Sequence, residues 1–189
     1  MELKKIVVAS SNEGKIAEIK SIFTDVEIVS MHELGFTDEI EETGKSFKEN
    51  AKIKAETVAK KFNLPALSDD SGLCVESLHG APGIYSARFS GEGPAGNRKL
   101  LLKRMENVSD RRAHFESAVC LCLPSGKTYF GQGKTYGKIL YEEIGTNGFG
   151  YDCLFYSDDL KKSFGLATEE EKNEVSHRYR ALADLRSKL

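Results

Sequence analysis

Short apolar runs alternate with amphipathic stretches along the first third of the chain. Residues 6–9 (IVVA) form a continuous apolar run, which is typical of a strand buried on both faces. Apolar residues then recur at helical spacing, which predicts a helix over about 13–23 and a second one over 46–62. A further strand is expected at 26–29. A strand, a polar turn and a helix in succession indicate an α/β fold.

The rest of the chain predicts a long hairpin and more helices. Alternation of apolar and polar residues predicts a strand over 113–123. A second strand over 128–133 is expected to return antiparallel to it. We expect helices at about 94–107 and 168–189 and a short strand at 153–155. The last helix is expected to bury one apolar stripe, formed by Val175, Tyr179, Leu182, Leu185 and Leu189.

Length and composition indicate one soluble domain. At 189 residues we expect a single domain over 1–189 with two lobes, the second at roughly 90–145. The 29 acidic and 27 basic residues give a net charge of −2, which argues against a surface that wraps nucleic acid. No stretch approaches the ~20 apolar residues of a membrane span. The N-terminus predicts a first strand rather than a signal peptide, so we expect a cytoplasmic protein.

The four cysteines point to the same compartment. They are Cys74, Cys120, Cys122 and Cys153. They lie in apolar segments and lack the spacing of a zinc motif. We therefore interpret them as reduced thiols that serve as small core residues, in preference to redox or metal-binding groups.

The segment 68–72 (SDDSG) carries two adjacent carboxylates between apolar flanks. The flanks predict buried strands, which would place Asp69 and Asp70 at a strand end, where open α/β sheets bind ligands. Two like charges side by side repel, so we expect a nearby cation or a shifted pKa. We interpret the pair as a site that holds Mg²⁺ and activates water against a nucleoside triphosphate.

Other constellations support this interpretation, and each has a plainer alternative. The turn at 10–15 (SSNEGK) has the small residues, glycine and lysine that can wrap a phosphate, or it is an ordinary solvated turn. It is not a P-loop, because no glycine precedes it at the required distance. Glu42 and Asp70 suit a hard cation, but their spacing alone does not bring them together.

Two further constellations involve aromatic and basic residues. The segment 148–152 (GFGYD) can expose a ring to a planar ligand, or it is a tight turn with a buried phenylalanine. Lys172 and Ser176 would share a helical face, with His177 and Arg178 able to donate to a ketone oxygen of a base. The alternative is a charged outer face of the final helix.

Taken together, the segments resemble the inosine triphosphate pyrophosphatase family. The match rests on SSNEGK (10–15), EETGKSFKENAKIKA (41–55), SDDSGL (68–73), GAPGIYSARF (80–89), NGFGYD (147–152), and Lys172 with SHR ending at Arg178. The resemblance implies an elongated two-lobed α/β fold, with a central mixed sheet flanked by helices and the active-site cleft between the lobes. It also implies a homodimer and Mg²⁺-dependent hydrolysis of ITP, dITP and XTP to the monophosphate and pyrophosphate.

The same resemblance implies a role for each matching residue. The residues expected to bind the triphosphate are Ser10, Ser11, Asn12, Glu13, Gly14, Lys15 and Lys54. Glu42 and Asp70 would hold Mg²⁺, and Asp70 would also take a proton from the attacking water. Whether Glu41 shares the metal role with Glu42 is left open by the sequence. The residues expected to touch the rest of the substrate are Ser71, Phe149, Gly150, Tyr151 and Asp152, and those expected to read the base edge are Lys172, His177 and Arg178.

Two other functions remain open at this point. One is a pyrophosphatase of the related Maf type, which acts on modified pyrimidine triphosphates. The other is a module that binds nucleotides or proteins without catalysis, although such a module has no need of Asp70.

Overall fold

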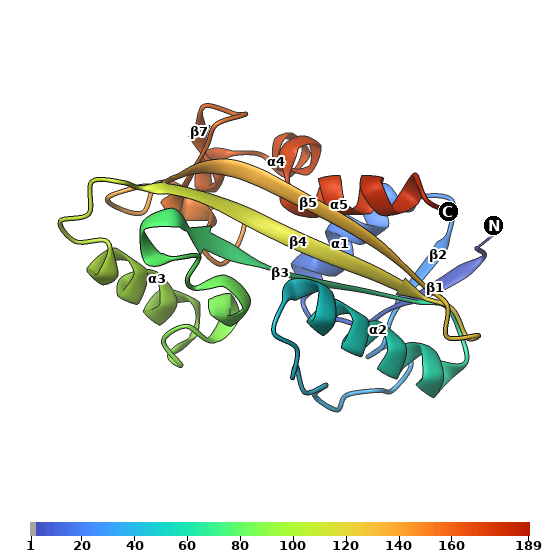
Figure 1. The fold of residues 1–189 in the computed structure, drawn as a ribbon. Coiled ribbons are helices and arrows are strands. Elements are labelled where there is room, and N and C mark those ends of the chain that lie inside the picture. The colour runs from blue at the N-terminus through green and yellow to red at the C-terminus, as the bar shows by residue number, and fades with distance from the viewer. Residues whose placement is uncertain (1–2) are drawn as a thin grey trace. The chain divides into compact units, whose positions relative to one another are not determined.

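The computed structural model describes residues 3–189, which form a mixed α/β fold with one seven-stranded sheet (Figure 1). The strands are hydrogen-bonded in the order β2-β1-β3-β4-β5-β6-β7. They are β1 (Lys5–Val8), β2 (Glu27–Ser30), β3 (Ala66–Val75), β4 (Arg112–Cys122), β5 (Thr128–Ile139), β6 (Phe155–Ser157) and β7 (Lys162–Ser163). The helices are α1 (Glu13–Ile22), α2 (Phe47–Phe62), α3 (Gly93–Arg104), α4 (Glu169–Val175) and α5 (His177–Arg186). Short 3-10 helices cover Glu76–Leu78, Gly83–Arg88, Asp152–Leu154 and Phe164–Leu166.

The chain folds into two compact units that are each discontinuous in sequence. Unit 1 consists of Met1–Asp70, Ser117–Gly133 and Arg178–Leu189. Unit 2 consists of Ser71–Glu116 and Lys134–His177. The segment 90–145, expected to form the second lobe, contributes residues to both units. Among the described residues, no helix combines the length and the apolar character needed to cross a bilayer.

Unit 1 has a core on each face of its strands, which explains the continuous apolar run at its start. Ile6 and Val8 pack with residues of α1 and α5, whereas Val7 packs with residues of α2. Figure 1 shows α5 and α2 on opposite sides of the strands. Because successive side chains of a strand point to opposite faces, a strand covered on both faces has no polar position to alternate with.

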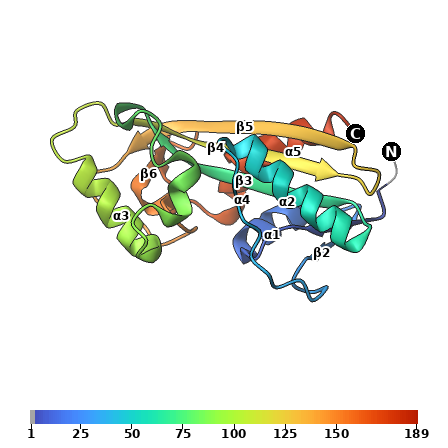
Figure 2. The same ribbon diagram turned by 60° about the horizontal axis from the view of Figure 1, so that its bottom comes forward.

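Unit 2 has a core of its own, which is rich in aromatic residues. Phe155 and Phe164 are fully buried there, and Leu101 of α3 packs in the same cluster. Figure 2 shows α3 beside the 3-10 helix Gly83–Arg88, against which it packs. The ring centroids of Phe115 and Phe155 lie 4.7 Å apart in a tilted arrangement, a geometry that aromatic pairs favour.

The predicted final helix is wrong, because the chain breaks at Ser176 into α4 and α5. Ser176 is extended (φ −66°, ψ 151°), and its N–H donates to the carbonyl of Lys172, which ends α4. The predicted stripe mixes residues of two cores, since Val175 packs in unit 2 and Leu182 packs in unit 1. Tyr179, expected on the stripe, is 40% exposed. One straight helix does not serve both cores.

Two strand boundaries also differ from prediction. The strand expected at 153–155 begins only at Phe155, because Asp152–Leu154 form a 3-10 helix. The return strand expected at 128–133 continues as β5 to Ile139, where it pairs antiparallel with Phe155 of β6. Buried and exposed residues alternate along the end of β5, although its glycines hide that pattern in the sequence.

Candidate active site

Asp69 and Asp70 lie inside β3 and not at its end, which corrects the prediction. The strand continues through them because Leu73 and Val75 are buried in the core of unit 2. The neighbouring strand β1 ends at Val8, which pairs with Leu67. The two carboxylates therefore lie just past the end of the parallel pairing with β1. The strand end that they adjoin is that of β1 and not that of β3.

Asp69 is completely buried and is neutralised by cations from two helices. The ammonium of Lys15 lies 3.1 Å from Asp69 Oδ1, and Arg178 Nε donates to Oδ2 at 3.0 Å. The Arg178 guanidinium also donates to Glu18. Burial alone would raise the pKa of Asp69, but Lys15 and Arg178 outweigh burial and hold that pKa far below its usual range. The two cations therefore favour the ionised form of Asp69.

Asp70 has the opposite electrostatic environment, although it is the next residue. Burial raises its pKa, and the carboxylates of Glu42 and Asp69 raise it further, against the lowering effect of Lys54. Asn50 Nδ2 donates to Asp70 Oδ2 at 3.2 Å. The expected nearby cation and shifted pKa are both present at Asp70, with burial as the largest cause of the shift.

Glu42 and Asp70 come together around one ammonium group. Lys54 Nζ lies 2.7 Å from Glu42 Oε1 and 3.3 Å from Asp70 Oδ1. Burial lowers the pKa of Lys54, but the surrounding carboxylates exceed this effect and raise the pKa overall. The structure therefore joins two acids that are 28 positions apart in sequence into one cation-binding arrangement.

The turn at 10–15 begins helix α1 as expected. Asn12 caps the helix, because its side-chain oxygen accepts from the Lys15 N–H at 3.1 Å. The positive end of the helix dipole therefore lies at this turn. Ser10, Ser11 and Glu13 line a cavity of 450 Å³ in unit 1.

Unit 2 holds a second cluster around Phe149. The ring of Phe149 is 41% exposed, and the Lys172 ammonium lies 4.5 Å from its centroid. Lys172 Nζ donates to Asp152 Oδ2 at 2.7 Å, and the Phe149 N–H donates to the same oxygen at 2.8 Å. Asp152 thus holds both the backbone of Phe149 and the Lys172 ammonium beside the ring.

The other predicted substrate residues are less accessible. Tyr151 belongs to the core of unit 2, and its hydroxyl donates to the Ser86 carbonyl at 2.7 Å. His177 is buried and stacks on Phe115, with ring centroids 4.9 Å apart. Ser71 is half-buried. Among the base-and-sugar residues, Phe149 therefore offers the most open aromatic surface.

Two site residues were missed at the level of sequence. Asn50 is fully buried and contacts Asp70, and Glu18 is buried beside Arg178. Asn50 falls on the buried stripe of α2, next to Ala51 and one turn after Phe47. The sequence signal for Asn50 is a polar residue on an apolar helical stripe, which indicates a buried polar partner because a buried polar group needs one.

We predict that Gly148→Ala weakens the Phe149 cluster more than Gly150→Ala does. Both glycines have positive φ (72° and 61°), so alanine at either position is strained by about 1–2 kcal/mol. At Gly148 the added Cβ would also lie 2.1 Å from Asp152 Oδ2, whereas at Gly150 it meets open space. The expected result is a higher KM for substrate with Gly148→Ala alone and, because of the clash with Asp152, a larger loss of unfolding free energy than with Gly150→Ala. Equal KM values would contradict the role of Asp152.

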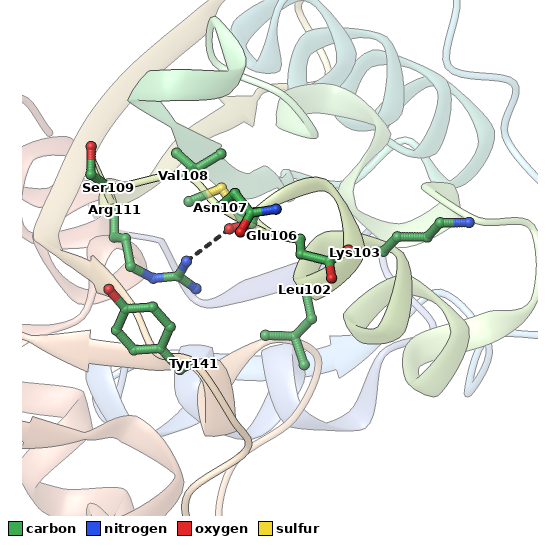
Figure 3. A pocket seen from close by; sticks show the side chains of 9 residues that line it. Leu102, Lys103, Glu106, Asn107, Val108, Ser109, Arg111 and Tyr141 are labelled. Atoms are coloured by element: carbon green, nitrogen blue, oxygen red, sulfur yellow. Dashed lines mark hydrogen bonds between the residues drawn. The ribbon is translucent and has the colours of Figure 1, made fainter.

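A cavity of 640 Å³ in unit 2 lies away from the predicted site residues (Figure 3). Arg111 and Tyr141 line it, with the guanidinium 4.1 Å from the Tyr141 ring centroid. Arg111 donates to the carbonyls of Met105, Ile139 and Leu140. The arginine therefore serves to hold the backbone together at this cavity.

Comparison with solved structures places the fold in a known class. The Ham1 protein of Staphylococcus aureus has a TM-score of 0.88 and 40% identity, and the comparison covers 97% of each chain. The HAM1 protein of Coxiella burnetii has a TM-score of 0.89 and 37% identity over 98% of each chain. The chain is thus an α/β protein of the Ham1 type.

The sequence comparisons lead to the same class. The model of the Ham1 family matches residues 6–188, so the chain belongs to the Ham1 family. A Bacillus licheniformis relative named dITP/XTP pyrophosphatase is 42% identical over 99% of this chain and 98% of its own. One from Desulfotalea psychrophila with the same name is 45% identical over 96% of this chain and 83% of its own. The resemblance predicted from the six segments is confirmed.

Proposed function

We propose that this chain hydrolyses non-standard purine nucleoside triphosphates, namely dITP, ITP and XTP, to the monophosphate and pyrophosphate. The observation that carries the proposal is the contrast between the two adjacent buried carboxylates. Asp69 is held ionised by Lys15 and Arg178, while the pKa of Asp70 is raised. A pair whose pKa values are pushed apart can divide charge binding from proton transfer. The names of the relatives give the substrate class.

In this proposal Asp70 is the general base. Its carboxylate takes a proton from the water that attacks the α-phosphorus. The pKa of Asp70 is raised in the metal-free chain and would fall with Mg²⁺ bound. The bond from the α-phosphorus to the bridging oxygen breaks, and pyrophosphate leaves. The ammonium groups of Lys15 and Lys54 lie next to the aspartates and offset the charge of the triphosphate.

Glu42 and Asp70 fit a Mg²⁺ ion, because hard cations bind one or two carboxylates together with substrate phosphates. Their oxygens already share one cationic partner, the Lys54 ammonium. When bound, Mg²⁺ would neutralise phosphate charge and favour attack at phosphorus. The chain's own residues still supply the proton acceptor at Asp70 and the phosphate-binding turn at 10–15.

We assign the base of the nucleotide to the cluster around Phe149. Its exposed ring offers a stacking surface, and Gly150, Tyr151 and Asp152 follow it in the same loop. Lys172 and His177 are the proposed donors to the 6-keto oxygen, whereas Arg178, which was also expected to read the base edge, is buried and donates to Asp69 and Glu18. A 6-amino purine would leave such donors unsatisfied, and a buried unpaired group costs about 1–3 kcal/mol. This difference favours inosine and xanthosine nucleotides over adenosine nucleotides.

We predict pyrophosphate release from dITP, ITP and XTP with Mg²⁺, and its loss with excess EDTA. The unsatisfied donors predict that kcat/KM for dATP is lower than that for dITP by about 10-fold or more, since ~1.4 kcal/mol corresponds to a factor of ten. The panel includes dUTP and 5-methyl-UTP, and pyrophosphate is measured for each. A preference for those pyrimidines would favour Maf-type activity, and no release from any triphosphate would favour a binding module.

We further propose a cytoplasmic homodimer. The four buried, unpaired thiols support a reducing compartment, and the homodimer follows from the resemblance to the inosine triphosphate pyrophosphatase family. Light scattering of the purified chain would give a mass near twice 20.9 kDa if the proposal is right.

A further inference from the structure

Unit 2 contains a group of three different metal-binding side chains outside the proposed active site. They are Cys74 of β3 and His114 and Glu116 of β4. One sulfur, one imidazole nitrogen and one carboxylate oxygen all lie within 4.8 Å of one another. His114 and Glu116 are two positions apart on one strand, so they point to the same face of the sheet. Cys74 is buried, and the other two are half-buried.

His114 lies between two carboxylates, and its Nδ1 is near one of them without a hydrogen bond in the described structure. Its Nδ1 lies 3.3 Å from Glu76 Oε1, and its Nε2 lies 3.6 Å from Glu116 Oε2. In metal sites one ring nitrogen binds the ion while the other is held by a carboxylate. Here Glu76 would hold Nδ1, which leaves Nε2 turned toward the group formed with Glu116 and Cys74.

The charges around the cluster describe its state without metal. Burial raises the pKa of the Cys74 thiol to about 11, and Glu116 and Glu76 raise it further against Lys134, so the thiol is protonated at neutral pH. Lys134 Nζ lies 3.1 Å from Glu116 Oε2 and balances that carboxylate. A bound dication would replace both the thiol proton and the role of the lysine.

We propose that Cys74, His114 and Glu116 bind one Zn²⁺ ion, with Glu76 positioning the His114 ring. One sulfur, one nitrogen and one oxygen ligand form the three-ligand set of an open tetrahedral zinc site, whose fourth position takes water. The bond forms between the Cys74 sulfur and the ion, and the thiol proton is released to solvent. Thiolate and imidazole select a borderline metal over Mg²⁺. This site is therefore chemically distinct from the all-oxygen pair Glu42 and Asp70.

The proposal also explains why the cysteines lack a zinc spacing in the sequence. Cys74 and His114 are 40 positions apart and come from different strands of the sheet. Cys74, interpreted from the sequence as a core thiol, would thus also be a metal ligand. Cys120, by contrast, is enclosed in the apolar core of unit 1.

The test is a Co²⁺ titration of the chelator-treated full chain, since Co²⁺ replaces Zn²⁺ and a thiolate bound to it gives a charge-transfer absorption. We expect this absorption to saturate at one equivalent, to be reversed by Zn²⁺, and to be absent in Cys74→Ser. Cys120→Ser is the matched control and should retain it. Co²⁺ bound at Glu42 and Asp70 would give no thiolate band, so failure here is distinguishable from failure of the proposed function.

Lys134→Met provides a test that depends on charge and leaves every ligand in place. Removing the competing ammonium should tighten Co²⁺ binding at least several-fold, and His114→Gln should weaken it at least tenfold. Circular dichroism checks that each variant is folded. If Cys74→Ser does not fold, His114→Gln tests the proposal in its place. The proposal is overturned if the wild-type chain shows no thiolate band, or if folded Cys74→Ser or His114→Gln binds Co²⁺ as the wild type does.

Discussion

Asp70→Asn is expected to lose about 10³-fold or more in kcat for dITP while it folds normally. Loss of a general base alone typically reduces the rate by about 10²–10⁴-fold. The fold should tolerate the change because Glu42 remains paired with Lys54, and because the raised pKa of Asp70 means that its ionised form is disfavoured in the native state. The measurements are steady-state pyrophosphate release and the free energy of unfolding in urea.

The sign of the pKa shift makes the stability prediction specific. A carboxyl group whose folded pKa is raised keeps its proton to higher pH in the native state than in the unfolded state. Above the folded pKa, the ionised Asp70 therefore destabilises the protein. Asn removes this unfavourable charge, so the variant should unfold at the same or a higher urea concentration at pH 7. A near-native turnover rate would refute the assignment of Asp70 as the base.

Asp69→Asn, one residue earlier, is expected to lower the free energy of unfolding by about 3–5 kcal/mol. This is the usual loss when one partner of a buried ion pair is removed, because the remaining charges stay buried without compensation. Lys15 would lose its carboxylate at 3.1 Å, and Arg178 would keep only Glu18 among these acids. Urea unfolding of the two asparagine variants side by side is the measurement, with Asp70→Asn as the matched control.

The pH dependence of stability gives a second readout for Asp69. Its folded pKa lies well below its ordinary value, so its contribution to stability is present at neutral pH. As the pH falls below about 4, the unfolded chain binds a proton that the native state does not, and this contribution is lost. The Asp69→Asn variant should therefore lose less stability than the wild type over that acidic range. Equal acid sensitivity would show that Asp69 is not held ionised.

The helices and most strands could be predicted because their patterns are local. The expected helices at 13–23 and 46–62 correspond to α1 and α2, and the alternation over 113–123 corresponds to β4. The break at Ser176 escaped prediction because it depends on which core each half of the segment meets. Periodicity along a chain does not distinguish one core from another.

The site was only partly predictable for a related reason. The resemblance selected Asp70, Glu42, Lys54 and Phe149, and the structure brings Asp70 and Glu42 together at the Lys54 ammonium. The roles of Glu18 and Asn50 depend on contacts across long sequence separations, which no spacing rule contains. The contrast between Asp69 and Asp70 likewise arises from three-dimensional surroundings, since their local sequence is nearly the same.

The Arg178 ion pairs have a consequence for how the protein is made on the ribosome. Arg178 contacts Asp69, 109 positions earlier, and Glu18, 160 positions earlier. Unit 1 also takes its last segment from Arg178–Leu189. A nascent chain in which Arg178 is not yet available therefore holds two acids without their guanidinium, and unit 1 completes its folding only once the segment 178–189 joins it. Contacts of such long range favour slow folding, so the closing of unit 1 by this segment is expected to be a late step.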